Sequence, residues 1–255
     1  MKITIVTITY NAAKVLQPTL DSVRRQTYPQ VEHLIVDGAS QDETLDIARK
    51  YKAENDAALG SHEVTITSKP DRGIYDAMNK GLDLATGQYI LFLNAGDCLP
   101  EADTLEHVAR LCAADVAVVY GDTDIIDGDG HITGHRHLQT PKRLSWRSFR
   151  QGMVVCHQAF YARTDIAREE RYNLAYRHSA DVDWCIRVMR RAENQRQRLV
   201  NADRVVALFL NGGDSQKNHK ASLRERYLVM CSHYGTTVTI VMHCWFAVRA
   251  LMRKL

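Results

Sequence analysis

The sequence predicts an α/β fold with a largely parallel central sheet flanked by helices. Across residues 1–100, short apolar strands alternate with segments of helical periodicity. This alternation is typical of a parallel sheet, because each helix returns the chain to start the next strand in the same direction. With 255 residues, of which 45% are apolar, the chain is long enough for one large domain or two small, tightly joined ones.

Each element of the first half follows from a local residue pattern. From Val15 to Val23 the apolar residues recur at helical spacing. Ser40 and Glu43 form a capping-box pattern, and we therefore expect a helix to begin at Ser40. The predicted elements are strands at 2–9, 33–36, 63–68 and 88–93, and helices at 12–26, 40–52 and 74–85.

The second half of the sequence is less regular. Its clearest local signal is Asp127-Gly-Asp-Gly130, a strong turn signal for a β-hairpin. A run with Trp184, Ile186 and Val188 among its apolar residues predicts a helix at 180–192. The other predicted elements are helices at 102–112 and from 223 onward, and strands at 116–120, 123–126, 131–137, 153–161 and 205–210.

Composition and charge limit the classes of function. The net charge of +3 is small, so we expect no nucleic acid partner. The six cysteines show no metal-type spacing, which favours a reducing cytoplasm. The first residues, Met1 to Val6, read directly as a strand and contain no signal-peptide core, so a cytoplasmic location is expected.

Two acidic residues follow predicted parallel strands. Asp37 comes directly after the strand at 33–36, and Asp97 closely follows the strand at 88–93. In an open α/β sheet, ligands bind beyond the carboxyl ends of the strands. Because no glycine precedes Gly38, the first strand-to-helix turn lacks a Gly-rich phosphate loop. The two acids therefore predict a site for a nucleotide-like ligand whose phosphate charge is offset by a divalent cation.

Four motifs, in order along the chain, resemble those of family 2 glycosyltransferases, which have the GT-A fold. The resemblance is closest to the bacterial branch that builds capsule, exopolysaccharide and lipopolysaccharide O-chains, the O-antigen. The motifs are Thr7–Asn11, Ile35–Thr44, Asp71–Gly81 and Leu93–Asp97, and a later motif extends the resemblance to about residue 215. The resemblance implies a GT-A domain over residues 1–215, with a nucleotide-sugar-binding half at 1–100 and an acceptor half at 101–215.

The resemblance also implies which residues contact the donor. Asp37 would accept the N3–H of a uracil-type base, and because cytosine lacks this hydrogen, uridine or thymidine diphosphate sugars are favoured. Asn11 could instead stabilise its own turn. The implied nucleotide and donor contacts are Thr9, Asn11, Asp37, Asp71, Arg72, Asp76, Asn79 and Asn94.

The segment Asn94-Ala-Gly-Asp97 occupies the place of the family's metal-binding Asp-x-Asp motif. It departs from that motif at Asn94 and Gly96, which leaves Asp97 as the single acid and candidate metal ligand. One carboxylate with two diphosphate oxygens can still hold Mn²⁺ or Mg²⁺, because Mg²⁺ keeps several waters and takes few protein ligands. Asp122-Thr-Asp124 is a literal Asp-x-Asp, but it leads into a hairpin, and we interpret it as a chance match.

The segment Ser179–Arg187 resembles the family's Glu-Asp-x-Asp segment, which opens a helix beneath the acceptor site. The resemblance implies that Asp181 is the general base. An acid at a helix start also caps the helix and complements its dipole, so a purely structural role for Asp181 is the alternative. Asp183 is expected to cap or pack the helix.

Three further residues are candidates for contacts with the acceptor or the leaving diphosphate. His157 could face either of these, or it could be a hydrogen-bonded core histidine. Lys217 and His219 lie in a polar segment from Gly212 to Lys220. A positive charge in this segment would stabilise the departing anion, and the alternative is a plain basic loop.

Together these expectations describe an inverting, metal-dependent hexosyltransferase of surface polysaccharide biosynthesis. It would transfer a sugar from a UDP-type donor to a hydroxyl of a saccharide or lipid-linked saccharide acceptor. One alternative is a non-catalytic nucleotide-sugar-binding or scaffold protein, because Asn94, Gly96 and Ala180 all stand where the family has acids. A sugar nucleotidyltransferase is less favoured, because it requires a Gly-rich phosphate loop after the first strand.

Residues 216–255 are predicted as a C-terminal helical segment. Within it, Val238–Leu255 has too short an uncharged run for a transmembrane helix. Trp245 and Phe246 beside basic residues suit an interfacial helix on the cytoplasmic face of the inner membrane. The alternative is that this helix packs against the domain or against a second copy in a homodimer.

Overall fold

The centre of the molecule is an eight-stranded mixed sheet. The computed structural model describes residues 1–58, 62–212 and 219–252. The strand order is β3-β2-β1-β4-β7-β5-β6, and β8 also pairs with β5. The α/β prediction is therefore confirmed. The strands are β1 (Ile3–Thr9), β2 (Val31–Asp37), β3 (Glu63–Ser68), β4 (Tyr89–Phe92), β5 (Val116–Ile126), β6 (Ile132–His135), β7 (Phe160–Arg163) and β8 (Arg198–Leu210).

The first four strands form the parallel part of the sheet. β1 pairs in parallel with β2 and β4, and β2 pairs in parallel with β3. In the β1–β2 register Thr9 lies opposite Asp37, so the last residues of these two strands meet at one edge of the sheet. β7 joins β4 and β5 by antiparallel pairing, whereas β5 and β8 are parallel. The predicted, largely parallel sheet is thus extended by antiparallel strands from the second half.

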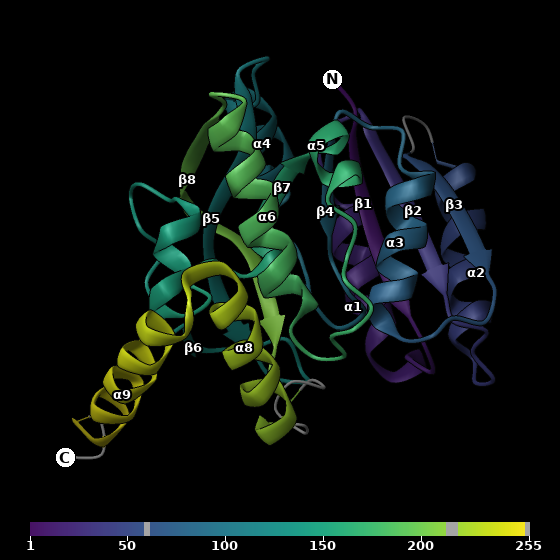
Figure 1. Cartoon of the computed structure of the whole chain (residues 1–255). Helices are drawn as coiled ribbons and strands as arrows, with labels where there is room; N and C mark the ends of the chain where they lie inside the picture. Colours follow the sequence, from purple (N-terminus) through teal and green to yellow (C-terminus); the bar gives the residue numbers. More distant parts are fainter. Residues whose placement is uncertain (59–61, 213–218, 253–255) are drawn as a thin grey trace.

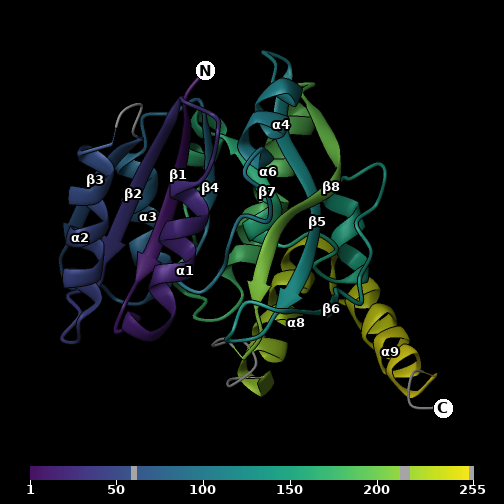
Figure 2. The same ribbon diagram turned by 180° about the vertical axis from the view of Figure 1, so that it is seen from behind.

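Helices cover both faces of the sheet, as predicted. α3, α5 and α6 lie over the face that is in front in Figure 1, whereas α1 and α2 lie over the opposite face, in front in Figure 2. A small apolar core that includes Leu20, Ile35 and Tyr51 lies between α1, α2 and the sheet. The helices are α1 (Ala13–Arg24), α2 (Thr44–Asp56), α3 (Ile74–Leu84), α4 (Thr104–Leu111), α5 (Thr164–Glu169), α6 (Ala180–Asn194), α8 (His219–Tyr234) and α9 (Thr236–Met252), with short 3₁₀ helices η1 (Trp146–Gln151) and η2 (His157–Ala159).

The predicted start of the second helix at Ser40 is wrong. α2 begins at Thr44, and its N-cap position is Glu43. The hydroxyl of Ser40 donates a 2.5 Å hydrogen bond to Asp37, so it does not cap the helix. Ser40 therefore belongs to the loop after β2, where its hydroxyl fixes the carboxylate of Asp37.

Three strand predictions in the second half are corrected. The strands expected at 116–120 and 123–126 form one strand, β5, which runs through Gly121. A Cβ on Gly121 would come 2.7 Å from the carbonyl oxygen of Arg204, so glycine is needed there because β8 approaches closely. The apolar run expected as a strand at 153–161 forms η2 and only the start of β7, because an apolar run without period does not specify a strand.

The last two helices form a hairpin. α8 and α9 are separated by Gly235, whose φ of 82° suits glycine at a tight turn. In both views α9 extends away from the rest of the molecule toward the C-terminus (Figures 1 and 2). Within residues 1–58, 62–212 and 219–252, no helix combines the length and the apolar character that crossing a membrane requires.

Candidate active site

The carboxylate of Asp37 lies at the edge of the sheet and is surrounded by hydrogen-bond donors. Its Oδ1 accepts from the hydroxyls of Thr9 at 3.0 Å and Ser40 at 2.5 Å. Its Oδ2 accepts from the backbone N–H of Ser40 at 3.0 Å and from the Ser68 hydroxyl at 2.7 Å. Burial tends to raise the pKa of Asp37, but these hydrogen bonds outweigh it and hold the pKa below its usual value. A base N–H can reach this carboxylate only if one hydroxyl turns away.

Asn11 connects the loops that follow β1 and β2. Its φ of 47° places it in the left-handed region, which asparagine tolerates better than most residues. Its side-chain oxygen accepts from the backbone N–H of Gln41 at 2.9 Å, and its own N–H donates to the Ser40 hydroxyl at 2.9 Å. These contacts agree with the alternative in which Asn11 stabilises the turn.

Asp71 lies beside the loop that carries Asp37. Its Oδ1 accepts from the backbone N–H of Gly73 at 2.9 Å. A Cβ on Gly38 would come 2.5 Å from Oδ2 of Asp71, so the two loops touch, and a side chain at Gly38 would require the carboxylate of Asp71 to move. The structure thus places Asp37 and Asp71 in adjoining loops at the same edge of the sheet.

Arg72 and Asp76 line a second cavity, of about 430 Å³, next to the N-terminus of α3. Asp76 accepts from the backbone N–H of Arg72 at 3.1 Å. The Arg72 side chain is 79% exposed, and its guanidinium lies 3.4 Å from Asp76. Leu174 and Tyr176 also line this cavity.

Asn79, which was expected to contact the donor, holds a neighbouring loop. Its side-chain amide donates to the carbonyl of Tyr172 at 3.0 Å and accepts from the N–H of the same residue at 2.8 Å. Asn79 is 4% exposed. Because both polar atoms of its side chain are used within the protein, we leave Asn79 out of the donor site proposed below.

Four of the predicted residues line one cavity of about 220 Å³. They are Asn94, Asp97, His157 and Asp181, which come from the loop after β4, from η2 and from the start of α6. The sequence separates these segments widely, but the pairing of β4 with β7 brings them together. The other residues that line the cavity are Ile74, Tyr75, Ala95, Gln158, Arg177, His178, Phe209 and Leu210.

Asp97 is the buried acid of this cavity. It is 4% exposed, and it accepts hydrogen bonds from the side chain of Gln158 at 2.9 Å and from the backbone N–H of Leu210 at 3.0 Å. Burial raises the pKa of Asp97 to about 6, although the two hydrogen bonds oppose this effect.

The surroundings of Asp97 fit a hard divalent cation. Among the described residues, each carboxylate oxygen of Asp97 accepts one hydrogen bond, which leaves a lone pair on each oxygen for a further contact. A cation with mostly water and phosphate ligands needs little more from the protein. In the same cavity Oδ1 of Asn94 is buried and, within the described part of the chain, has no hydrogen-bond partner, so it can accept a bond from a bound donor.

Asp181 is the second acid, in the first turn of α6. Its side chain is 17% exposed. The hydroxyl of Tyr75 donates to its Oδ1 at 3.1 Å, and Nδ1 of His157 lies 3.3 Å from its Oδ2. Burial tends to raise the pKa of Asp181, but His157, the backbone N–H of Val182 and the charge of Arg226 together outweigh this effect and lower the pKa. The two acids of the cavity therefore have pKa values shifted in opposite directions.

Asp183 has a structural role, as expected. It is 5% exposed and pairs with Nε of Arg187 at 2.8 Å and with Nε2 of His233 at 2.8 Å. These contacts join α6 to α8.

Sequence reasoning missed two residues of the cavity. Tyr75 and Gln158, which hydrogen-bond to Asp181 and Asp97, were given no role in the sequence analysis. The available signal for Gln158 was its place next to His157, since the two adjacent side chains reach the two different acids.

Two other predicted contacts cannot be placed. Lys217 lies outside the described residues. The backbone of His219 begins α8, but its side chain is not described.

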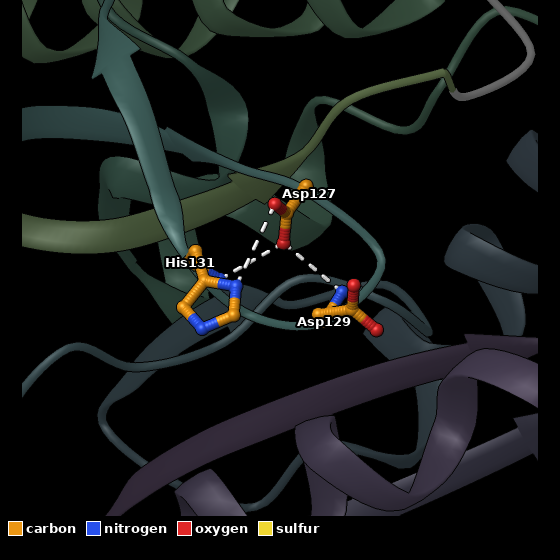
Figure 3. A group of neighbouring side chains, drawn as sticks. All are labelled: Asp127, Asp129 and His131. Atoms are coloured by element: carbon orange, nitrogen blue, oxygen red, sulfur yellow. Dashed lines mark hydrogen bonds and ion pairs between the residues drawn. The ribbon is translucent and has the colours of Figure 1, made fainter.

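The acids of the β5–β6 hairpin are separate from Asp97. Asp124, from the literal Asp-x-Asp, lies 2.5 Å from Nδ1 of His135 and does not line the cavity that holds Asp97. In the hairpin turn, the ligand atoms of Asp127, Asp129 and His131 all lie within 4.8 Å of one another (Figure 3). Oδ1 of Asp127 accepts from the backbone N–H groups of Asp129 and His131 at 3.0 and 2.9 Å. The turn therefore accounts for this cluster, and we assign no metal to it.

Comparison with known proteins establishes the family. The family model for glycosyl transferase family 2 matches residues 4–194. The chain belongs to this family. The predicted family is thus confirmed. A PGL/p-HBAD biosynthesis glycosyltransferase of Mycobacterium tuberculosis is 42% identical to this family member over 182 residues, which are 70% of this chain and 66% of the relative. Glycosyltransferase AglE of Haloferax volcanii is 31% identical over 163 residues, which are 63% of this chain and 52% of the relative.

Solved structures of glycosyltransferases share the fold. S. aureus TarS 1–349 in complex with UDP-GlcNAc matches with a TM-score of 0.70 at 15% identity, over 95% of this chain and 70% of TarS 1–349. The mannosyltransferase PcManGT of Pyrobaculum calidifontis, in complex with GDP-Man and Mn²⁺, matches with a TM-score of 0.58 at 18% identity, over 99% of this chain and 79% of that protein. The predicted GT-A-type fold of this family 2 member is therefore confirmed.

Proposed function

We propose that this protein is an inverting glycosyltransferase that transfers a sugar from a nucleoside diphosphate to an acceptor hydroxyl. One observation carries the proposal: Asp97 and Asp181 line the same cavity at the carboxyl end of β4, with pKa values shifted in opposite directions. Paired acids whose environments separate their pKa values are typical of an active site. Membership of glycosyl transferase family 2 supports this reading.

The proposed mechanism assigns a separate task to each acid. Asp181, whose lowered pKa keeps it ionised, removes the proton of the acceptor hydroxyl as that oxygen attacks the anomeric carbon. The attack comes from the face opposite the diphosphate, so the configuration inverts. A divalent cation, Mn²⁺ or Mg²⁺, bound at Asp97 would neutralise the charge of the departing diphosphate.

We propose a uridine donor, held in the nucleotide-sugar half at residues 1–100. Asp37 would offer an acceptor for the N3–H of uracil, and Thr9, Asp71, Arg72, Asp76 and Asn94 are the proposed contacts to the rest of the donor. The fold is shared both with TarS, solved with UDP-GlcNAc, and with PcManGT, solved with GDP-Man. The fold itself therefore does not select the base, and the choice of uridine rests on Asp37.

A panel of nucleotides tests the donor. Thermal shifts would be measured with UDP, GDP, UDP-GlcNAc and GDP-Man, each with Mn²⁺, because a specific ligand stabilises the folded state in proportion to the logarithm of its concentration over Kd. We expect a response selective for uridine compounds that is reduced in Asp37→Asn. A response confined to guanosine compounds would overturn the donor assignment.

The rival proposal is a nucleotide-sugar-binding scaffold without catalysis. Hydrolysis of UDP-GlcNAc would be followed with and without Mn²⁺ in the wild type and in Asp181→Asn. We expect slow hydrolysis in the wild type and a loss of about 100-fold or more in the variant. Binding without turnover, unaffected by the substitution, would favour the scaffold.

We propose that the acceptor is a saccharide or a lipid-linked saccharide of surface polysaccharide biosynthesis, bound in the half at residues 101–215 on the cytoplasmic side of the membrane. The C-terminal segment at 216–255 would then lie at the membrane interface. Residues 219–255 contain six Lys and Arg residues and one Glu, and on α9 Val241, Trp245 and Leu251 are 61%, 47% and 66% exposed. An exposed apolar surface with basic residues suits an anionic lipid interface.

Vesicle flotation tests the membrane contact. We expect binding to phosphatidylglycerol-containing vesicles, weaker binding to phosphatidylcholine alone, and loss of binding in Trp245→Glu. If the protein instead forms a dimer that Trp245→Glu dissociates, the exposed surface of α9 contacts a second copy.

A further inference from the structure

Four side chains form a continuous line of contacts across the cavity. Nδ2 of Asn94 lies 3.2 Å from Nε2 of His157, and Nδ1 of His157 lies 3.3 Å from Oδ2 of Asp181. On the other side of Asp181, the hydroxyl of Tyr75 donates to Oδ1 at 3.1 Å. These residues come from the loop after β4, from η2, α6 and α3, so each contact joins segments that are distant in sequence.

The chemistry of the groups fixes the direction of these contacts. An ionised carboxylate is an acceptor only, so the ring nitrogen that faces Asp181 must carry a hydrogen. That nitrogen is Nδ1 of His157. In a neutral imidazole the other nitrogen, Nε2, is then an acceptor and needs a donor. The side-chain NH₂ of Asn94 supplies that donor.

We propose that His157 is a positioning residue for Asp181, held by Asn94 in the tautomer that carries its hydrogen on Nδ1. The inference rests on the proposed role of Asp181 as general base. With His157 on Oδ2 and Tyr75 on Oδ1, the carboxylate is held on both sides and cannot rotate freely about its Cβ–Cγ bond. A free lone pair is thereby aimed at the acceptor hydroxyl, and such alignment before reaction contributes to the rate.

The burial of His157 favours this role over that of a solvated side chain. His157 is 9% exposed, and the ring contacts polar side chains at both nitrogens. Its contact with Asp181 is long for a hydrogen bond, which is common in the unliganded state, where catalytic hydrogen bonds tighten only when substrate is bound.

The same arrangement explains why Asn94 departs from the acid of the family motif. A carboxylate at this position could only accept, so it could not supply the donor that Nε2 needs when the ring hydrogen is on Nδ1. The ring would then have to move its hydrogen to Nε2 or take up a second proton, and either change removes the neutral Nδ1–H tautomer. The side-chain NH₂ of Asn94 can donate to Nε2 of His157, which an aspartate cannot do. Asparagine therefore fits the tautomer with its hydrogen on Nδ1, the nitrogen that faces Asp181.

Imidazole nitrogen shifts measured by NMR test the tautomer without any substrate. Long-range ¹H–¹⁵N correlation spectra of the ¹⁵N-labelled full chain would be recorded at neutral pH, with His157→Asn identifying the signals. We expect the nitrogen shifts of a ring with its hydrogen on Nδ1, and Asn94→Asp to remove that pattern. A hydrogen on Nε2 in the wild type, or rapid exchange between tautomers, would overturn the proposal.

A pair of substitutions at His157 tests its effect on the base. An asparagine side chain can place its NH₂ near the position of Nδ1, whereas glutamine places it near Nε2. In Mn²⁺-dependent hydrolysis of UDP-GlcNAc, we expect His157→Asn to retain kcat within about tenfold and His157→Gln to lose about 100-fold or more. KM for UDP-GlcNAc is expected to stay unchanged in both variants.

Equal losses in the two variants, or a loss confined to KM, would contradict the positioning role. If the wild type does not turn over any donor, the proposed function fails and the role in catalysis fails with it. The NMR result would still report separately whether Asn94 fixes the tautomer of His157, so the two failures are distinguishable.

Discussion

The backbone N–H of Leu210, the last residue of β8, donates a 3.0 Å hydrogen bond to Oδ1 of Asp97. Close by, Cys98, which follows Asp97, and Leu208, two residues before Leu210, exchange backbone hydrogen bonds of 3.0 and 2.8 Å. The loop after β4 is therefore held by β8 before any ligand binds. Asp97 is kept at a defined position, which is what a site that binds charge in the transition state requires.

Asp97→Asn is expected to abolish the effect of Mn²⁺ on UDP binding and to lower donor turnover by about 100-fold or more. The amide keeps the size of the side chain and can still accept from Leu210, so the fold should be preserved. The measurement is the thermal shift produced by UDP with and without Mn²⁺. Asp122→Asn, in the literal Asp-x-Asp, is the matched control and should respond as the wild type does. An unchanged metal response in Asp97→Asn would exclude Asp97 as the ligand.

Asn79→Ala is expected to destabilise the fold without weakening donor binding. The substitution leaves the buried N–H and C=O of Tyr172 without their partners, which costs about 2 to 4 kcal/mol. Urea denaturation gives the free energy of unfolding, and calorimetric titration with UDP gives Kd. A variant of normal stability with weakened UDP binding would instead return Asn79 to the donor site.

His33 is expected to make the protein less stable as the pH falls. Burial lowers its pKa to about 3, with a smaller effect of nearby His62. Between pH 6.5 and about 3 the unfolded chain binds this proton and the folded chain does not, so the free energy of unfolding decreases on acidification by about 1.4 kcal/mol per pH unit.

Comparing how the free energy of unfolding depends on pH in the wild type and in His33→Gln isolates the contribution of His33. The neutral ring of His33 contacts Thr7 and Tyr51, each at 2.9 Å, so His33→Gln keeps polar atoms but cannot titrate. Urea denaturation from pH 7.5 to 5 should show a flatter dependence in the variant, by about 2 kcal/mol over the range. Identical slopes in the two proteins would refute the assignment to His33.

The sequence predicted which acids lie at the carboxyl ends of the parallel strands, because the local strand and helix patterns are enough to specify the parallel sheet. Asp37 and Asp97 were expected after two parallel strands of one sheet, and the alternation of strands and helices specifies that arrangement. The contact from Gln158 to Asp97 spans 61 residues, and no local pattern encodes it. Tyr75 is 8% exposed and its hydroxyl donates to Asp181, a contact across 106 residues that helical periodicity does not show. The Ser40 hydroxyl could either cap the next helix or donate to Asp37. The sequence allows both contacts, and the fold places Ser40 next to Asp37.

Gly38→Ala is expected to weaken UDP binding by about tenfold while changing the free energy of unfolding by less than about 1 kcal/mol. The new methyl group would come within 2.5 Å of Oδ2 of Asp71, and the movable end of that side chain must turn away. Gly128→Ala is the matched control, because a Cβ there meets no atom within 4 Å among the described residues. Calorimetric titration with UDP and urea denaturation measure the two quantities. Unchanged affinity in Gly38→Ala would show that Asp71 takes no part in binding the nucleotide, whereas a large loss of stability would show that the loops cannot yield.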